Sequence, residues 1–235
     1  LVANTEGVFA EEKRVRTRLF VLAVAQDGAE VQTGYSAPGK SVGLELFDLY
    51  PPKAVGEKAA RQALTNLKAR PAPAGTFPVV VGPGFGGVLF HEAVGHLLET
   101  TSVARKASVL ADKLGEVVAS PAVTYIDDGT LPHAWGSTEM DDEGRPTERT
   151  VLIEKGVLKS YMVDRLGHLL TGYPMTGSGR RQDYTFAPTS RMRNTFLAPG
   201  EARVEDLFAG IAFGLYAKEM GGGQVKPGSG EYNFA

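Results

Sequence analysis

The chain has 235 residues, 43% of them hydrophobic and 22% charged, which is typical of a folded globular protein. No uncharged apolar run approaches the roughly 18 residues of a membrane helix, and no signal peptide is visible, so we expect no membrane partner. The net charge is −2 with scattered basic residues, which argues against a nucleic-acid partner. Cysteine is absent, which excludes disulfides and thiolate ligands within these residues and fits a cytoplasmic location.

The first third of the sequence predicts a hairpin followed by a helix. Residues 7–36 alternate in the manner of strands, and Asp27-Gly28 is a hairpin-type turn. From Ala54 to Ala69, small and apolar residues fall on one stripe of a helix. Pro71 and Pro73 then exclude a continuing helix, so we place the domain boundary in this stretch.

Short elements are predicted in the remainder of the chain. The expected strands are 77–81, buried on both faces, then 122–126, 150–153 and 157–162, with a turn at Lys155-Gly156, and the expected helices begin near Val88 and cover 203–218. The mixture predicts an α+β fold, rich in β-structure toward the C-terminus.

The segment His91-Glu92-Ala93-Val94-Gly95-His96 is the strongest chemical signal. Neutral imidazole is a preferred zinc ligand, and a carboxylate between two histidines can act as a general base. The spacing is unusual, because residues five apart lie about 140° apart on a regular helix. A regular helix would therefore not bring both rings to one ion.

Two arrangements would resolve this spacing. A one-residue π-bulge near Gly95 would return His91 and His96 to one face, leaving Glu92 free as the base. Alternatively, Glu92 and His96 are the ligands and His91 only supports them. We favour the bulge, and a histidine that simply packs in an apolar core is the structural alternative to both.

Glycines surround the turn that precedes this helix, in the sequence GPGFGG. Gly82, Gly84 and Gly87 match the spacing of a dinucleotide-binding turn, which makes a nucleotide site a competing hypothesis. No acidic strand end follows about twenty residues later, where that motif places a ribose ligand. We therefore interpret these glycines as positions of tight packing.

Five motifs in order resemble the TldD/PmbA (TldE) family. They are GVLFHEAVGHLLE, DDEGRPTERTVLIEKGVLKSYMVDR, TGSGRR, RMRNTFLAPG and YAKEMGGGQVKPGSGEYNFA. The HExxxH spacing resembles the metalloprotease (TldD-type) subunits, since PmbA-type subunits lack it. The resemblance implies that residues 1–74 are the end of an α/β N-terminal domain with its connecting helix. It also implies that 75–235 form a metalloprotease C-terminal domain, incomplete at its C-terminus, so that the chain is an internal fragment.

The same resemblance implies a zinc-dependent peptidase that cleaves unfolded or small peptides through a metal-activated water. His91 and His96 would be zinc ligands and Glu92 the catalytic base, and the third ligand would be a cysteine that this chain does not contain. The expected partner is a second subunit, in a homodimer or in a heterodimer with a PmbA/TldE-like chain. A noncatalytic or metal-free scaffold subunit is the alternative function.

Other polar residues carry weaker predictions. Gly179, Arg180 and Arg181, and separately Gly222 and Gly223, are candidates for binding a peptide substrate. The acidic pairs at 127–128 and 141–142 are expected to be solvated turns. The remaining aromatic and histidine residues are expected to pack or to lie in turns: His133, Trp135, Tyr161 and His168.

Overall fold

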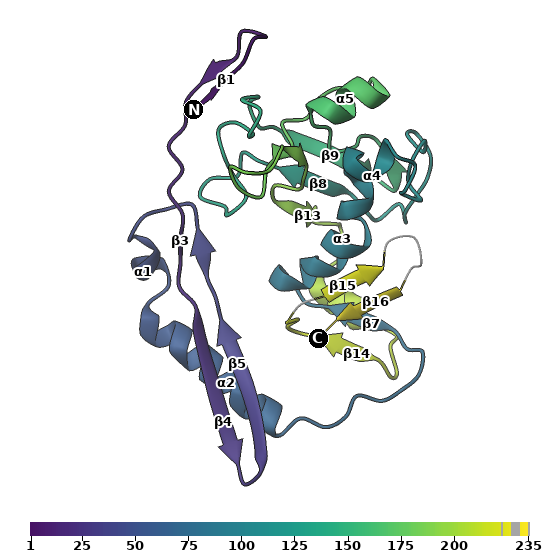
Figure 1. The fold of residues 1–235 in the computed structure, drawn as a ribbon. Coiled ribbons are helices and arrows are strands. Elements are labelled where there is room, and N and C mark those ends of the chain that lie inside the picture. The colour runs from purple at the N-terminus through teal and green to yellow at the C-terminus, as the bar shows by residue number, and fades with distance from the viewer. Residues whose placement is uncertain (222, 227–230, 235) are drawn as a thin grey trace. The chain divides into compact units, whose positions relative to one another are not determined.

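The computed structural model describes the chain except for residues 222, 227–230 and 235. It folds into two compact units, of which the smaller comprises 13–75 with 132–135 and the larger comprises 1–12, 76–131 and 136–235. Antiparallel strands and short helices occur together, as predicted for an α+β fold (Figure 1). No helix within the described ranges is long and apolar enough to span a membrane.

The smaller unit is a hairpin covered by one helix. Its elements are β3 (Thr17–Arg18), β4 (Val21–Asp27), β5 (Glu30–Ser36), β6 (Gly39–Lys40), α1 (Leu46–Leu49) and α2 (Pro52–Leu67). Strands β4 and β5 pair antiparallel around Gly28, whose φ of 58° is accessible to glycine at little cost. The turn predicted at Asp27-Gly28 is therefore confirmed.

Helix α2 buries a narrower stripe than the sequence predicted. Val55, Ala59 and Ala63 are buried, whereas Leu64, an apolar residue of the same helix, is 54% exposed. The helix lies directly against β5, because a Cβ at Gly34 would overlap the backbone of Ala59 and Ala63. Small residues at the contact allow this close approach of helix and strand.

The larger unit contains residues 91–96, the segment from His91 to His96, which we call the metal motif. Its elements are β1 (Val2–Ala3), β2 (Phe9–Ala10), β7 (Val79–Val81), η1 (Gly84–Gly87), α3 (Val88–Ala93), η2 (Gly95–Leu98), α4 (Thr100–Val103), β8 (Tyr125–Asp128), β9 (Arg149–Glu154), β10 (Val157–Leu158), α5 (Arg165–Thr171), β11 (Gly179–Arg180), β12 (Thr189–Ser190), β13 (Thr195–Leu197), η3 (Val204–Phe208), β14 (Leu215–Ala217), β15 (Gly223–Lys226) and β16 (Glu231–Phe234).

A four-stranded antiparallel sheet, in the order β10-β9-β8-β13, forms the centre of the larger unit (Figure 1). The turn between β9 and β10 is Lys155-Gly156, as predicted, and both residues have positive φ. The core packed on this sheet consists of Leu98, Val103, Tyr125, Leu152, Ile153, Leu158, Tyr161, Met162, Val163 and Met192. The residues that follow the metal motif thus belong to the main hydrophobic core.

The prediction of a helix over residues 203–218 is wrong. The segment forms only the short 3₁₀ helix η3 and then strand β14, which pairs in parallel with β7. Gly210 has a φ of 76°, which ends any helical path, and Gly214 approaches the Pro78 carbonyl so closely that a Cβ would lie 2.8 Å from it. Glycine and strand pairing therefore override the apolar periodicity of this segment.

The strand predicted at 77–81 is present in shortened form as β7. Its burial differs from the prediction, because Val79 is 53% exposed and the pair β7-β14 is a separate two-stranded sheet. The apolar run correctly indicated a strand, but it could not show that the side chain of Val79 would be exposed.

Three of the four acidic residues expected in solvated turns are buried instead, whereas Asp142 is partly exposed in a turn. Asp127, Asp128 and Asp141 are each at most 3% exposed. Asp141 accepts hydrogen bonds from the backbone N–H groups of Glu143, Arg145 and Gly179, at 2.9 to 3.0 Å. A buried carboxylate is costly unless it is hydrogen-bonded, and these N–H donors meet that need.

Asp127 gives the stability of the protein a testable pH dependence. Burial raises the pKa of this carboxyl from 3.8 to about 7, and the neighbouring Asp128 charge acts in the same direction. The hydrogen bond from the Arg193 N–H and the charges of Arg193 and Arg180 lower the pKa and offset part of this rise. The folded state therefore binds this proton more tightly than the unfolded state. The contribution of Asp127 to stability is fully present below about pH 4, falls as the pH rises toward 7, and then levels off.

The substitution Asp127→Asn keeps an oxygen that can accept from the Arg193 N–H and removes the charge. We expect the free energy of unfolding to exceed that of the wild type at pH 8, by up to about 4 kcal/mol, and to match it near pH 4. Urea unfolding across this pH range measures the difference. An identical pH dependence in both proteins would contradict the assignment to Asp127.

Candidate metal centre

The segment that carries the metal motif changes helix type in its middle. Helix α3 ends at Ala93, Val94 has φ −127° and ψ −45°, and the 3₁₀ helix η2 begins at Gly95. The Val94 N–H makes the last α-helical bond to the Phe90 carbonyl, at 3.0 Å, and the Leu97 N–H bonds to the Val94 carbonyl. The expected irregularity near Gly95 is present, but it is a junction between α and 3₁₀ helix rather than a π-bulge.

Close packing at Gly95 accompanies this junction. A Cβ on Gly95 would overlap the Met192 sulfur and lie 3.1 Å from the Tyr125 hydroxyl. Met192 and Tyr125 are both buried in the core on the central sheet. Only a residue without a side chain allows the backbone to pass this close to the core.

The junction brings the side chains of His91, Glu92 and His96 together. One ligand atom from each lies within 4.8 Å of the other two, and the two imidazole rings meet edge to face with centroids 4.8 Å apart. The His96 Nε2 atom lies 3.9 Å from a Glu92 carboxylate oxygen. Both histidines therefore face one small volume, a placement that a regular helix would not give.

The surroundings of His91 favour its neutral form. Burial lowers the pKa of this imidazole, and the neighbouring His96 charge lowers it further, against the raising effects of Glu92 and Glu99. The Arg180 charge acts in the same lowering direction. A neutral imidazole has the free nitrogen lone pair that a metal ion requires.

Glu99 is a residue of this site that the sequence analysis did not single out. Its carboxylate is buried, with one oxygen 3.2 Å from His96 Nδ1 and the other 3.2 Å from an Arg191 guanidinium nitrogen. The spacing of three residues after His96 was a usable signal, since it predicts neighbouring side chains on a helix. The contact with Arg191, 92 residues later, could not be read from the sequence.

The glycine-rich turn before α3 packs tightly at two of its positions. A Cβ at Gly82 would lie 2.6 Å from the Lys218 carbonyl, and one at Gly86 would lie 2.7 Å from the Val81 side chain. Gly84 instead has a φ of 76° and open space around it. The packing interpretation of the turn therefore holds for Gly82 and Gly86.

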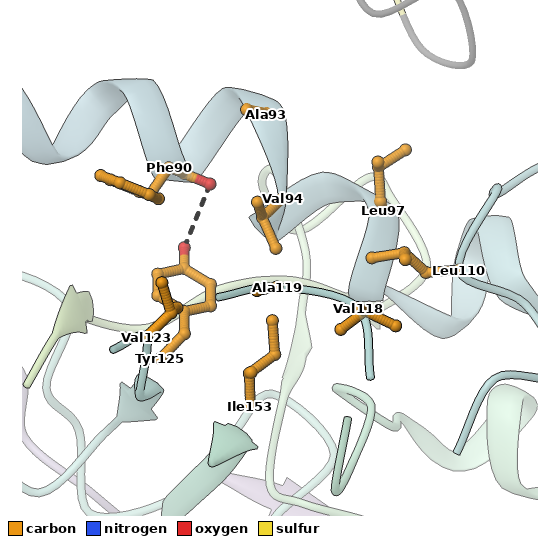
Figure 2. Close-up of a pocket in the computed structure, with 10 residues that line it drawn as sticks. All are labelled: Phe90, Ala93, Val94, Leu97, Leu110, Val118, Ala119, Val123, Tyr125 and Ile153. Atoms are coloured by element: carbon orange, nitrogen blue, oxygen red, sulfur yellow. Dashed lines mark hydrogen bonds between the residues drawn. The ribbon is translucent and has the colours of Figure 1, made fainter. Parts of the chain in front are cut away.

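An apolar pocket of about 200 Å³ lies beside α3 and η2, against the sheet residue Tyr125 (Figure 2). Its wall on the helical segment consists of Phe90, Ala93, Val94 and Leu97, and the Tyr125 hydroxyl donates to the Phe90 carbonyl at 3.4 Å. None of the three polar residues of the metal motif lines this pocket. The apolar residues of α3 and η2 that line the pocket thus lie on a different face from His91, Glu92 and His96.

The candidate substrate-binding residues differ in their surroundings. The Gly179 N–H donates to Asp141, and both the Arg181 N–H and its guanidinium bond to Asp142, so these two residues hold loops together. The Arg180 side chain is exposed, and its charge acts on His91. Gly222 lies outside the described residues, and Gly223 begins strand β15.

The two remaining histidines do not join the cluster. His133 is exposed at a position with a φ of 58°, and His168 lies in α5 with its Nδ1 atom 2.7 Å from the Tyr173 carbonyl. Tyr161 is buried and donates to the Leu110 carbonyl, as expected for a packing residue. Trp135 is partly exposed, with the Arg16 guanidinium 5.9 Å from its ring.

Two family descriptions match the chain. Residues 1–67 match the PmbA/TldA metallopeptidase central domain, and residues 74–235 match the PmbA/TldA metallopeptidase C-terminal domain. The chain belongs to the TldD/PmbA family. The predicted resemblance is therefore confirmed.

Curated relatives of this family member are named metalloproteases. A TldD homologue from Haemophilus influenzae is 40% identical over the whole chain, which covers 50% of that relative. A metalloprotease from Methanocaldococcus jannaschii is 38% identical over 98% of the chain and 51% of the relative. A protein named zinc metalloprotease TldD homologue, from Saccharolobus solfataricus, is 31% identical over 92% of the chain and 48% of the relative. The chain thus spans about half the length of these relatives.

Two solved structures share the fold. TldE from Thermococcus kodakarensis superposes with a TM-score of 0.73 at 22% identity, over 93% of this chain and 49% of that one. A Thermotoga maritima protein, described as a candidate modulator of a DNA gyrase, superposes with a TM-score of 0.70 at 30% identity, over 87% and 45% of the two chains. The α+β architecture is therefore that of known TldD/PmbA-type structures.

The packing at Gly95 leads to a prediction. The substitution Gly95→Ala must displace Met192 or the backbone between His91 and His96, so we expect a loss of stability of about 1–3 kcal/mol. Zinc affinity should fall together with it, because the histidines would separate. Thermal unfolding and zinc titration of the full-length protein measure both effects.

Gly87 provides a matched control, since it lies at the start of the same helix with helical φ and ψ and open space around it. The substitution Gly87→Ala should leave zinc affinity unchanged and should not destabilise the protein. Equal behaviour of the two variants would show that the close approach at Gly95 does not matter.

Proposed function

We propose that this protein is the zinc-binding part of a metallopeptidase, with His91 and His96 as ligands and Glu92 as the general base. The observation that carries the proposal is the convergence of these three side chains within 4.8 Å on one short segment. The names of the curated relatives support a metalloprotease, and one of those names specifies zinc. The curated relatives that carry these names are about twice as long as this chain.

The donor set suits zinc. Imidazole nitrogens bind zinc at about 2.0–2.1 Å, and a catalytic site usually has three protein ligands and one open position. Two imidazoles are present here, and we propose that the third ligand is a cysteine from outside these 235 residues. Zinc, when bound, would polarise the peptide carbonyl and lower the pKa of a water molecule.

Glu92 supplies the proton transfer in this proposal. Its carboxylate lies 3.9 Å from His96 Nε2, beside the nitrogen that would face the metal, and its side chain is 20% exposed. From there it can accept a proton from the attacking water and return that proton to the leaving amine. The partly exposed position leaves the carboxylate within reach of solvent for both transfers.

The proposed substrates are unfolded or small peptides. Arg180 is the candidate for contacting a substrate carboxylate or carbonyl, because it is exposed and its charge reaches His91. The proposed assembly is a dimer, either of two copies or with a PmbA/TldE-like subunit. The cytoplasmic location stays a prediction from the sequence.

The substitution Glu92→Gln in the full-length protein tests the role of the base. Zinc content should stay near that of the wild type, because both histidines remain, whereas cleavage of an unfolded peptide should fall by about 10²–10⁴-fold. His91→Ala is the companion variant and should lose zinc and activity together. Peptide cleavage by Glu92→Gln at the wild-type rate would remove Glu92 from the mechanism, and a wild type that binds no zinc would favour a scaffold subunit.

The role of Arg180 predicts a separate kinetic effect. Arg180→Ala should raise KM for peptide substrates by about 10- to 150-fold with little change in kcat, since a charge-assisted hydrogen bond contributes about 1.5–3 kcal/mol. Lys159→Ala, at another exposed basic residue of the larger unit, is the control and should leave KM unchanged. An unchanged KM in Arg180→Ala would remove this contact from the proposal.

A further inference from the structure

Glu99 is a buried carboxylate that the proposed chemistry does not use directly. It is 3% exposed, and its two oxygens contact different partners, His96 Nδ1 and an Arg191 guanidinium nitrogen, each at 3.2 Å. A charge buried to this degree requires such partners, because desolvation alone would be costly. The carboxylate therefore bridges a candidate metal ligand and a cation.

The backbone around Glu99 is fixed on both sides. The Thr100 N–H donates to the Met162 carbonyl at 3.0 Å, and the Met162 N–H donates to the Leu98 carbonyl at 2.9 Å. The Glu99 carbonyl accepts the N–H groups of Ser102 and Val103 at the start of α4. These bonds hold the backbone of the residue against the core, and the contacts with His96 and Arg191 then orient its carboxylate.

Arg191 is held by a second element. Its backbone N–H donates to the Ser178 carbonyl at 3.0 Å, directly beside the pair β11-β12. The neighbouring Ser190 hydroxyl accepts the Thr101 N–H at 2.9 Å, which connects β12 to α4. The guanidinium thus reaches Glu99 from a segment that is independently fixed to the same region.

The geometry at His96 has a chemical consequence. An ionised carboxylate only accepts hydrogen bonds, so the imidazole proton belongs on Nδ1, the atom beside Glu99. The lone pair then lies on Nε2, which is the nitrogen on the side of Glu92. His91, by contrast, makes no hydrogen bond through its ring within the described residues and is placed by burial and by its contact with His96.

We propose that Glu99, braced by Arg191, is a positioning residue that fixes the tautomer and ring orientation of His96, so that Nε2 is presented to the metal. The inference rests on the proposed function for the presence of the metal and for the role of His96 as its ligand. Partners of this kind on the second nitrogen of a ligating histidine orient the ring and raise its basicity. The arrangement would make His96 the preorganised ligand of the pair.

The first test is made without metal. Nitrogen NMR of ¹⁵N-histidine-labelled, metal-free full-length protein distinguishes the two tautomers of His96. The wild type should show a protonated Nδ1, and Glu99→Ala should shift toward a protonated Nε2. Glu99→Gln should shift in the same direction, because its single acceptor oxygen would face the Arg191 guanidinium and its NH2 group would donate to Nδ1. A wild type with Nε2 protonated, or a Glu99→Ala variant with an unchanged tautomer, would overturn the inference whatever the protein does with zinc.

The second test measures zinc affinity by competition with a chromophoric chelator. Glu99→Ala should weaken zinc binding by about 10- to 100-fold, Glu99→Gln should weaken it as well, and both should alter the cobalt(II) absorption spectrum. Asp164→Asn is the control, because Asp164 is equally buried and its carboxylate caps α5 without contacting a histidine side chain. It should affect stability alone. Unchanged zinc affinity and cobalt spectrum in folded Glu99→Ala would contradict the role of Glu99, whereas absence of zinc binding in the wild type would instead contradict the proposed function.

Discussion

The close approach of the Gly95 backbone to Met192 and Tyr125 is the constraint on which the candidate metal centre depends. Two histidines five residues apart point in different directions on a regular helix. Here the helix ends at Ala93 and resumes as a tighter 3₁₀ turn, so that both rings face the same volume. Because Met192 and Tyr125 belong to the core on the central sheet, the position of the sheet determines the path of the motif.

Buried carboxylates extend this constraint into the loops of the larger unit. Asp141 accepts backbone N–H groups from its own turn and from Gly179, and Asp164 both caps α5 and accepts the Thr100 hydroxyl. Each bond joins segments that share little regular secondary structure. The same principle places Glu99 between His96 and Arg191. Polar groups therefore position this site as much as apolar packing does, and each is satisfied by a defined partner.

Local patterns in the sequence predicted local structure well. The turn at Asp27-Gly28, helix α2 and the turn at Lys155-Gly156 depend on residues that are close in the sequence, and the structure has all of them. The boundary placed after residue 74 falls in the coil between α2 and β7. These features follow from glycine conformation and from apolar periodicity, which a single sequence displays.

Interactions between distant residues account for what the sequence could not predict. The segment 203–218 has helical periodicity, yet Leu215–Ala217 pairs with β7, more than 130 residues earlier in the chain. The aspartates at 127, 128 and 141 have the composition of exposed turns and are buried by segments that arrive later in the chain. At the site, the spacing suggested an irregular helix, but its form and the role of Glu99 depend on Met192 and Arg191.

The central claim is that the junction after Ala93 makes His91 and His96 ligands of the same ion. A crystal structure of the zinc-loaded full-length protein, with zinc located by anomalous scattering, tests it most directly. The account predicts one nitrogen from each histidine at about 2.0–2.1 Å from zinc, with His96 bound through Nε2 and Glu92 outside the coordination sphere. Zinc held by Glu92 and His96, with His91 turned away from the ion, would contradict it.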